Sequence, residues 1–296
     1  MAAPLPEALV PSVAEGGVGE GWGFGWFRRL SLDVAIPAAI LALIAGACFL
    51  GPLVLPIPRP VGGNILSANL PPFSPGHPLG TNPVGNDILS QILYGGRVSF
   101  EVGLGTNLIG LVVGGLLGTV AAYRGGLLDA VIMRVLDVLI AFPSLVLALA
   151  IAEGLGPGEL NVIWALSFFT VPAFARIARA ATLRLREQTF MLAAQLVGTR
   201  SWRMLLRHIA PNVLPQLVTF GLLGVGVAII LEGALSFLGL GVRPPNPSWG
   251  NMIALGQQTL TAQPQLVLIP SIFVFVTVLA LNLLGDALRV RWAVPQ

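Results

Sequence analysis

The chain has 296 residues, a formal net charge of +3, a mean hydropathy of +0.85 and only 10% charged residues, whereas soluble domains carry about a quarter. This composition excludes an ordinary soluble fold and predicts an all-α membrane protein. All 16 basic residues are arginine, so the chain has no lysine for a P-loop or a Schiff base. The single Cys48 excludes an internal disulfide, and the distant His77 and His208 predict no local metal site.

Residues 1–30 are predicted to be a cytoplasmic tail. The segment lacks the basic start of a secretory signal and contains several prolines and glycines. The alternative is an interfacial anchor, because aromatic side chains prefer the membrane surface. The aromatic residues in question are Trp22, Phe24, Trp26 and Phe27.

Six apolar stretches predict transmembrane helices, because a helix needs about 20 residues to cross the bilayer. The fourth stretch is short and contains Pro172, so we expect it to continue as helix into the basic segment that follows. The second is rich in glycine, which lets membrane helices approach closely. The predicted spans are Ile36–Leu55, Val98–Ala122, Val131–Ala152, Val162–Ala175, Val213–Leu231 and Leu266–Leu284.

Two long outer loops are predicted, at residues 56–97 and 239–265. An apolar face over residues 88–93, after a possible cap at Asn86, predicts an interfacial helix before the second span. That face holds Ile88, Leu89, Ile92 and Leu93. In the second loop, Pro244, Pro245 and Pro247 are expected to fix the turns.

Arginine placement predicts the orientation. With a cytoplasmic N-terminus, thirteen arginines lie in inner segments, and only Arg59, Arg97 and Arg243 lie in outer ones. Because cytoplasmic loops carry the excess of positive charge, both termini are predicted to be cytoplasmic. The same bias accounts for a pI near 10.0 without a nucleic-acid partner.

The inner loop at residues 176–212 predicts two short helices, each with one apolar face at helical spacing. Gly198 is expected to end the first helix, Ser201 to cap the second, and Pro211 to lead into the fifth span. Periodicity alone leaves two interpretations open: an element lying on the membrane surface, or a helix that docks in a groove of a partner. The two faces are Phe190, Ala193, Ala194 and Val197, and Trp202, Leu205, Leu206 and Ile209.

Three charged residues fall inside predicted spans and a fourth, Glu232, directly follows one; a charge there is costly and needs a reason. Arg134 and Asp137, three positions apart, predict an ion pair on one helix face. Glu101, near the outer end of its span, is expected to be solvated or paired. Glu232 ends the fifth span and is expected to pair within the bundle, with substrate contact as the alternative. None of the four has the neighbours that acid–base catalysis needs.

Several collinear motifs between about His77 and Arg289 resemble the permeases of binding-protein-dependent ABC importers, and in particular the C-type subunit of the dipeptide/oligopeptide/nickel family. The inner loop is similar to the EAA loop of that family. The motifs are Ala193-Ala194-x-x-x-Gly198 with His208-Ile209-Ala210-Pro211, Gly80-Thr81-Asn82-x-x-Gly85-Asn86-Asp87, Tyr94-Gly95-Gly96-Arg97-Val98-Ser99, the stretch Leu235–Met252, and Asn282-Leu283-Leu284-Gly285-Asp286.

The resemblance implies a type I ABC importer permease fold, with a first span and long outer loop at 31–96 and a permease domain at 97–289 that contains the coupling loop 176–212. It implies a multi-pass protein of the bacterial inner membrane whose partners are a homologous B-type permease, two cytoplasmic ATPases and an extracytoplasmic solute-binding protein. ATP and Mg²⁺ would bind to the ATPases. This chain would bind no cofactor and would not be an enzyme. The implied coupling residues are Phe190, Ala193, Ala194, Val197, Gly198, Arg203, Arg207, His208 and Pro211.

Three positions depart from the family pattern. Leu192 stands where a glutamate is usual, so we expect docking to depend on shape and on arginines rather than on that acid. Asn82 and Asn86 replace an acidic residue and an arginine, which puts a charge network in the outer loop in doubt.

The predicted spans hold few ionisable groups and no histidine, which argues against a ligand-lined path for a metal. A wide, weakly specific cavity suits di- and oligopeptides, so peptide import by alternating access is the predicted function. Nickel or another small solute is the alternative within the family. A stand-alone secondary transporter is the rival class, and it would show broken helices in repeats or a line of ionisable residues.

Overall fold

The computed structural model describes residues 32–54 and 56–292, and the predicted tail at 1–30 lies outside them. The described residues form helices and no strand. The helices are α1 (Leu32–Val54), α2 (Ile88–Ile109), α3 (Gly115–Arg124), α4 (Gly126–Ile140), α5 (Ser144–Leu155), α6 (Glu159–Arg186), α7 (Thr189–Leu196), α8 (Ser201–Met204), α9 (Ala210–Phe237), α10 (Trp249–Gly256) and α11 (Gln265–Trp292).

Five continuous helices are long and apolar enough to cross a membrane, and a bent pair can supply a sixth span. Two of the five are joined through π-helical turns. The turn Gly110–Gly114 links α2 to α3, and the turn Leu205–Ile209 links α8 to α9, giving helices of 37 residues each. The prediction of an all-helical membrane protein is therefore confirmed, with five continuous candidate spans and a sixth if the bent pair counts as one.

The third predicted span is not one helix. α4 and α5 meet at an angle of 86° across residues 141–143. Pro143 is the physical reason, because it has no N–H to donate to the carbonyl of Leu139 and disfavours helical geometry at Phe142. The sequence contained this signal, and the prediction of a continuous helix over Val131–Ala152 is wrong.

The predicted interfacial helix before the second span is also wrong, because residues 88–93 are the first turns of α2 itself. The helix is capped by Asp87 rather than by Asn86, with the Ser90 N–H donating to the Asp87 carboxylate at 2.8 Å. Gly96 does not break it. A Cβ there would lie 2.4 Å from the Cys48 sulfur and 2.5 Å from the Trp249 ring, so glycine is required by packing.

Glycines of the second span allow the close helix approach that the sequence predicted, and the partner is α6. A Cβ at Gly114 would lie 2.3 Å from the Val171 carbonyl oxygen, and one at Gly118 would lie 2.0 Å from that of Ala175. Real side chains do not approach a backbone oxygen so closely. The two helices can therefore touch only because both positions lack a side chain.

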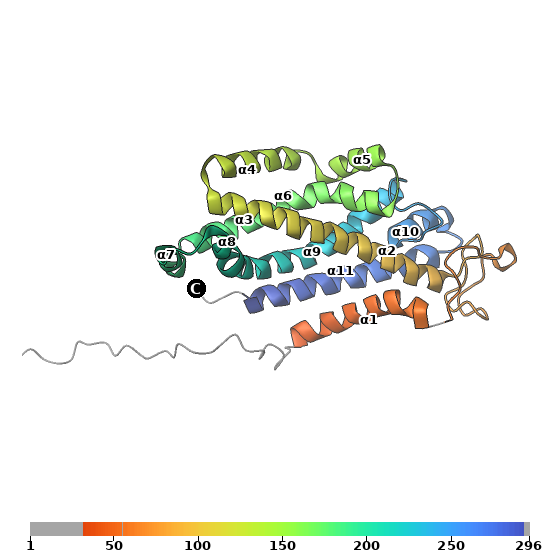
Figure 1. Cartoon of the computed structure of the whole chain (residues 1–296). Helices are drawn as coiled ribbons and strands as arrows, with labels where there is room; N and C mark the ends of the chain where they lie inside the picture. Colours follow the sequence, from red (N-terminus) through yellow and green to blue (C-terminus); the bar gives the residue numbers. More distant parts are fainter. Residues whose placement is uncertain (1–31, 55, 293–296) are drawn as a thin grey trace, which may run out of the picture.

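The helices run side by side, with α1 on one side of the bundle and α4–α5 on the opposite side (Figure 1). α7 and α8 lie at one end, here called the α7 end. The loop 56–87 and α10 lie at the other end, here called the α10 end. α10 was not predicted within the loop 239–265. Its Ser248 accepts the N–H of Asn251 and caps it.

Candidate coupling site

The first helix of the inner loop, α7, ends at Gly198. This glycine has φ +79°, a left-handed conformation that suits glycine. The Gly198 N–H donates to the Gln195 carbonyl at 2.9 Å, and the Thr199 N–H donates to the Ala194 carbonyl at 3.1 Å. These two bonds form a Schellman motif. The sequence therefore located the end of α7 correctly.

α7 is attached to the bundle through Met191, which is fully buried, and through the half-buried Ala194. Met191 joins a cluster that includes Phe174 of α6 and Val213 of α9. The predicted apolar face does not make this contact. Apart from Ala194 it is exposed, and with Leu192 and Leu196 it forms an apolar surface that no described residue covers. The exposed members are Phe190, Leu192, Ala193, Leu196 and Val197.

The second helix of the loop packs through Met204 and Ile209, both fully buried. Ile209 belongs to the predicted face, but Trp202 and Leu206 of the same face are more than half exposed. The reason is the π-helical turn at 205–209, which widens the helix and brings positions five apart onto one side. Ser201 makes no capping bond with its side chain, so the predicted cap is wrong as well.

Pro211 explains why the π-turn lies where it does. Proline cannot donate the next helical hydrogen bond, and a local π-turn is one way in which a long helix continues past it. Asn212 then donates its side-chain N–H to the His208 carbonyl at 2.7 Å. The His208 ring lies against Phe190, with centroids 6.5 Å apart, so the two helices also contact one another directly.

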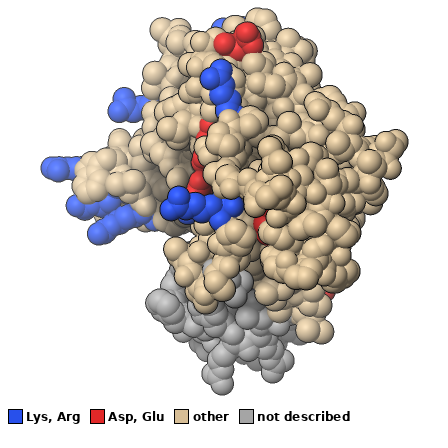
Figure 2. Space-filling model, turned by 90° about the vertical axis from the view of Figure 1, so that its right-hand side faces the viewer, with Lys and Arg blue, Asp and Glu red and all other residues tan. Residues whose placement is uncertain are grey.

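Residues 189–212, here called the α7–α8 element, thus have one side that packs against the bundle and one side that is exposed. Arg203 stacks over the Trp202 ring at 5.4 Å, and Arg200 and Arg207 are exposed beside it. Seen from the α10 end, basic side chains project along one side of the molecule (Figure 2). An exposed apolar surface bordered by arginines is typical of a protein-binding site rather than of a free surface.

Residues 111–293 match the family model described as "Binding-protein-dependent transport system inner membrane component". The chain is 38% identical to a glutathione transport system permease protein, GsiD, of Pectobacterium atrosepticum, over 95% of this chain and 94% of the relative. It is 41% identical to GsiD of Escherichia coli O6:K15:H31, over 72% and 70%. The chain belongs to this family. It is an ABC importer permease and not a stand-alone transporter.

The fold agrees with that assignment. A solved structure titled "Inward facing conformations of the MetNI methionine ABC transporter" superposes with a TM-score of 0.57, covering 69% of this chain and 97% of that one. The sequence identity is 15%, so the likeness concerns the fold alone. It is the type I permease fold that the motifs implied.

Asp137 of this permease pairs differently from the prediction. Asp137 accepts a hydrogen bond from Arg176 of α6 at 2.7 Å, not from Arg134 of its own helix. A second pair, Asp129 and Arg179, also joins α4 to α6. Both pairs connect residues at least 39 positions apart, so helical spacing within one span could not reveal them.

Glu101 pairs with Arg97 one turn earlier, at 2.8 Å, near the α10 end. Glu232 is fully buried. It accepts hydrogen bonds from Ser236 and Ser248 at 2.7 Å each, while the Ser99 hydroxyl lies at 3.5 Å. The partners of Glu232 are hydroxyl groups of α2, α9 and the loop before α10. Its role in this permease is therefore to join three elements, as the prediction of pairing within the bundle required.

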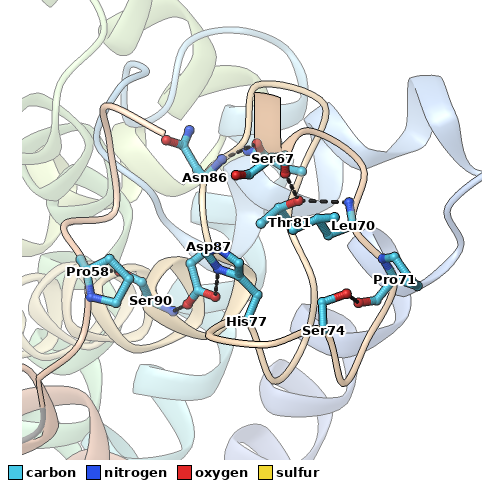
Figure 3. Close-up of polar contacts among 11 residues, drawn as sticks. Pro58, Ser67, Leu70, Pro71, Ser74, His77, Thr81, Asn86, Asp87 and Ser90 are labelled. Atoms are coloured by element: carbon cyan, nitrogen blue, oxygen red, sulfur yellow. Dashed lines mark hydrogen bonds and ion pairs between the residues drawn. The ribbon is translucent and has the colours of Figure 1, made fainter. Parts of the chain in front are cut away.

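The loop 56–87 is held by its own polar contacts (Figure 3). His77 Nδ1 lies 2.9 Å from the Asp87 carboxylate, which also caps α2. The Ser90 hydroxyl donates to the Pro58 carbonyl at 2.6 Å, and Thr81 accepts the Leu70 N–H at 2.9 Å. These bonds fasten the loop to the first turn of α2.

Asn82 and Asn86, which replace charged residues of the family pattern, form a neutral network instead. The Asn82 side-chain oxygen accepts the N–H groups of Val84 and Asn86, at 3.0 and 2.9 Å. The Asn86 oxygen accepts the Gly63 N–H at 2.7 Å. Amide groups thus organise this turn.

Proposed function

We propose that this permease, together with a homologous B-type permease, forms the route by which short peptides cross the bacterial inner membrane. Two ATPases would drive alternating access, and an extracytoplasmic binding protein would deliver the substrate. ATP and Mg²⁺ would bind the ATPases and not this chain. The α7 end and both termini would lie in the cytoplasm, because that end carries most of the arginines.

The observation that carries this proposal is the open apolar surface of the α7–α8 element. Exposed leucine and valine at the arginine-rich end of a membrane bundle need a partner, and a helix presented in this way fits a groove on a soluble ATPase. Phe190, Ala193 and Val197 would enter the groove, with Leu192 replacing the usual glutamate by an apolar contact. Arg203 and Arg207 would border it, and Gly198, Ala194, His208 and Pro211 would hold the element in shape.

The domain division expected from the sequence fits this scheme. Residues 1–30 would be the tail, residues 31–96 the first span and outer loop, and residues 97–289 the permease domain, with the coupling loop at 176–212.

Relatives 38% and 41% identical are glutathione transport permeases, and glutathione is a peptide. Short peptides are therefore the proposed substrates, and nickel or another small solute is the second candidate.

Gly198 gives a sharp test of docking. A Cβ there meets nothing within 4 Å, so any effect of a substitution arises from the left-handed backbone and not from a clash. Gly198→Val should weaken co-purification of the ATPase and peptide uptake while the chain stays in the membrane. Gly198→Asn, which tolerates this conformation, is the matched control and should behave as the wild type. Unchanged co-purification and uptake in Gly198→Val would rule out the docking role.

The substrate is tested by deletion in a strain without other peptide importers. Loss of this subunit should abolish growth on a short peptide that supplies a required amino acid, while growth on the free amino acid continues. Intact peptide uptake with a fall in nickel-dependent enzyme activity would instead favour the second candidate.

A further inference from the structure

A groove of about 440 Å³ lies between α4 and α6. Four charged residues line it, in two ion pairs that cross from one helix to the other: Asp129 with Arg179, and Asp137 with Arg176. Asp129 lies in the first turn of α4, and Asp137 lies eight residues later, about 12 Å further along the helix. The groove therefore runs from the α7 end towards the middle of the bundle.

The two pairs differ in their remaining hydrogen-bonding capacity. Arg179 engages both oxygens of Asp129, through Nε and one terminal nitrogen at 2.7 Å each, so this carboxylate is occupied on both sides. Arg176 makes a single bond to Asp137 Oδ1. The other Asp137 oxygen and the other N–H groups of Arg176 bond to no described residue, and both side chains are about half exposed. The second pair is thus open to a ligand on both its acidic and its basic side.

Two independent features indicate that this side of the bundle does not face lipid. Ionisable side chains in membrane proteins face a protein interior or water, and these four line an open groove. The second feature is the break at residues 141–143, one turn beyond Asp137. Its three residues are exposed, and the Leu139 carbonyl loses its helical partner at Pro143. Irregular backbone at membrane depth occurs where it lines a water-filled cavity or is covered by protein.

We propose that this groove is a substrate-binding station on the translocation route. Arg176 binds a carboxylate of the peptide, and Asp137 accepts a hydrogen bond from an amide or ammonium N–H of the same peptide. Guanidinium matches a carboxylate in geometry and charge, and the acid beside it matches the donors that every peptide carries. Asp129 and Arg179 hold α4 and α6 at the required separation. This inference rests on the proposed import of peptides.

The test compares uptake of one peptide with a free C-terminal carboxylate and of the same peptide as its amide, in cells that express the whole transporter. Arg176→Gln should lower uptake of the free acid about tenfold relative to the wild type, which corresponds to the loss of one charge-assisted hydrogen bond. Uptake of the amide should fall much less. Using mutant-to-wild-type ratios for each peptide cancels the preference of the binding protein. Arg184→Gln is the matched control, since Arg184 is exposed on α6 outside the groove.

A charge-swapped variant, Asp137→Arg with Arg176→Asp, gives a second test that does not depend on the uptake of the peptide amide. If the pair serves only to join α4 to α6, the swap restores uptake of the free acid. If Arg176 binds substrate, the swap does not. Restoration by the swap, or equal uptake by Arg176→Gln and the wild type, overturns the inference and leaves peptide import standing. Absence of uptake by the wild type for every peptide would instead contradict the proposed function.

Discussion

The two ends of the bundle are built in contrasting ways. At the α10 end, Trp249, Ser248 and Glu232 are fully buried. The Trp249 ring nitrogen donates to the Ile92 carbonyl at 2.9 Å, and its ring packs against Phe100 and Phe273. At the α7 end, Leu196 and Val197 are 89% and 85% exposed. The core around Trp249 and Glu232 satisfies its apolar and polar groups within this chain, whereas α7 presents apolar groups that this chain does not cover.

This difference separates a region that closes the fold from a region that meets a partner. Where all contacts lie within the chain, a substitution should damage folding. Where the contacts are missing, a substitution should leave folding intact and damage assembly. Substitutions at the two ends should therefore fail in different assays, which makes the comparison testable.

The largest effect is expected between the two ends, where α3 meets α6. Gly118→Val should prevent the two helices from approaching, because its Cβ alone would lie 2.0 Å from a backbone oxygen of Ala175. We expect loss of the folded protein from the membrane, measured by membrane level and detergent-extracted monodispersity. Gly46→Val is the matched control, because a Cβ at Gly46 meets nothing within 4 Å. Equal yields of the two variants would contradict the packing account.

This contact also shows what the sequence could predict. The glycines four residues apart predicted close helix packing, and Gly198 predicted the end of α7. Both features depend on backbone geometry that only glycine suits. The π-turn at 205–209 was not anticipated. With this turn, Met204 is buried beside Ile209, while Trp202 and Leu206 of the predicted face are exposed, since a stripe drawn at 3.6 residues per turn assumes an unbroken α-helix. Pro211 was the available signal.

Polar contacts between distant residues were harder to predict from the sequence. Glu232 and Ser99 are 133 positions apart, and Asp129 and Arg179 are 50 apart. No periodicity relates such positions. Only the helix packing, which depends on the glycines and on the bend at Pro143, brings them together. The sequence therefore predicted the five continuous spans and the position of the two short helices between the fourth and fifth predicted spans, but not the break at Pro143 or the partners of the charged residues.

Glu232 gives the next largest effect. Glu232→Ala leaves the buried hydroxyls of Ser236 and Ser248 without their acceptor, at a cost of about 1–3 kcal/mol for each unsatisfied group. Thermal stability of the purified protein should fall clearly. Glu232→Gln keeps one acceptor oxygen for both serines and offers an amide N–H towards Ser99, so it should lose less. A Glu232→Gln variant as unstable as Glu232→Ala would show that the negative charge, not the hydrogen bonding, holds the three elements.

Two substitutions on α7 test separately the side that packs against the bundle and the side that is exposed. Met191→Ser should destabilise α7, because Met191 is fully buried in the cluster with Phe174, and removal of a large buried side chain costs about 2–5 kcal/mol. Leu196→Ser should leave stability unchanged and lower ATPase co-purification, because Leu196 is 89% exposed and would contact the partner only. The readouts are thermal unfolding of the permease and pull-down of the ATPase. Equal stability losses in both variants would show that α7 has no free side.

The smallest perturbation tests which end faces the cytoplasm. Leu66 of the loop 56–87 and Leu196 of α7 are each 89% exposed, so cysteines placed there should react equally well with a thiol reagent in solution. The native Cys48 is fully buried, and its thiol is shielded, so the wild-type chain is the unlabelled control. In intact cells, a membrane-impermeant maleimide should label Leu66→Cys and spare Leu196→Cys. After permeabilisation both should be labelled. Because the exposed fractions are matched, any difference in intact cells reports the membrane side and not local reactivity. Labelling of Leu196→Cys alone in intact cells would reverse the orientation, and the arginine-rich end could then not meet a cytoplasmic ATPase.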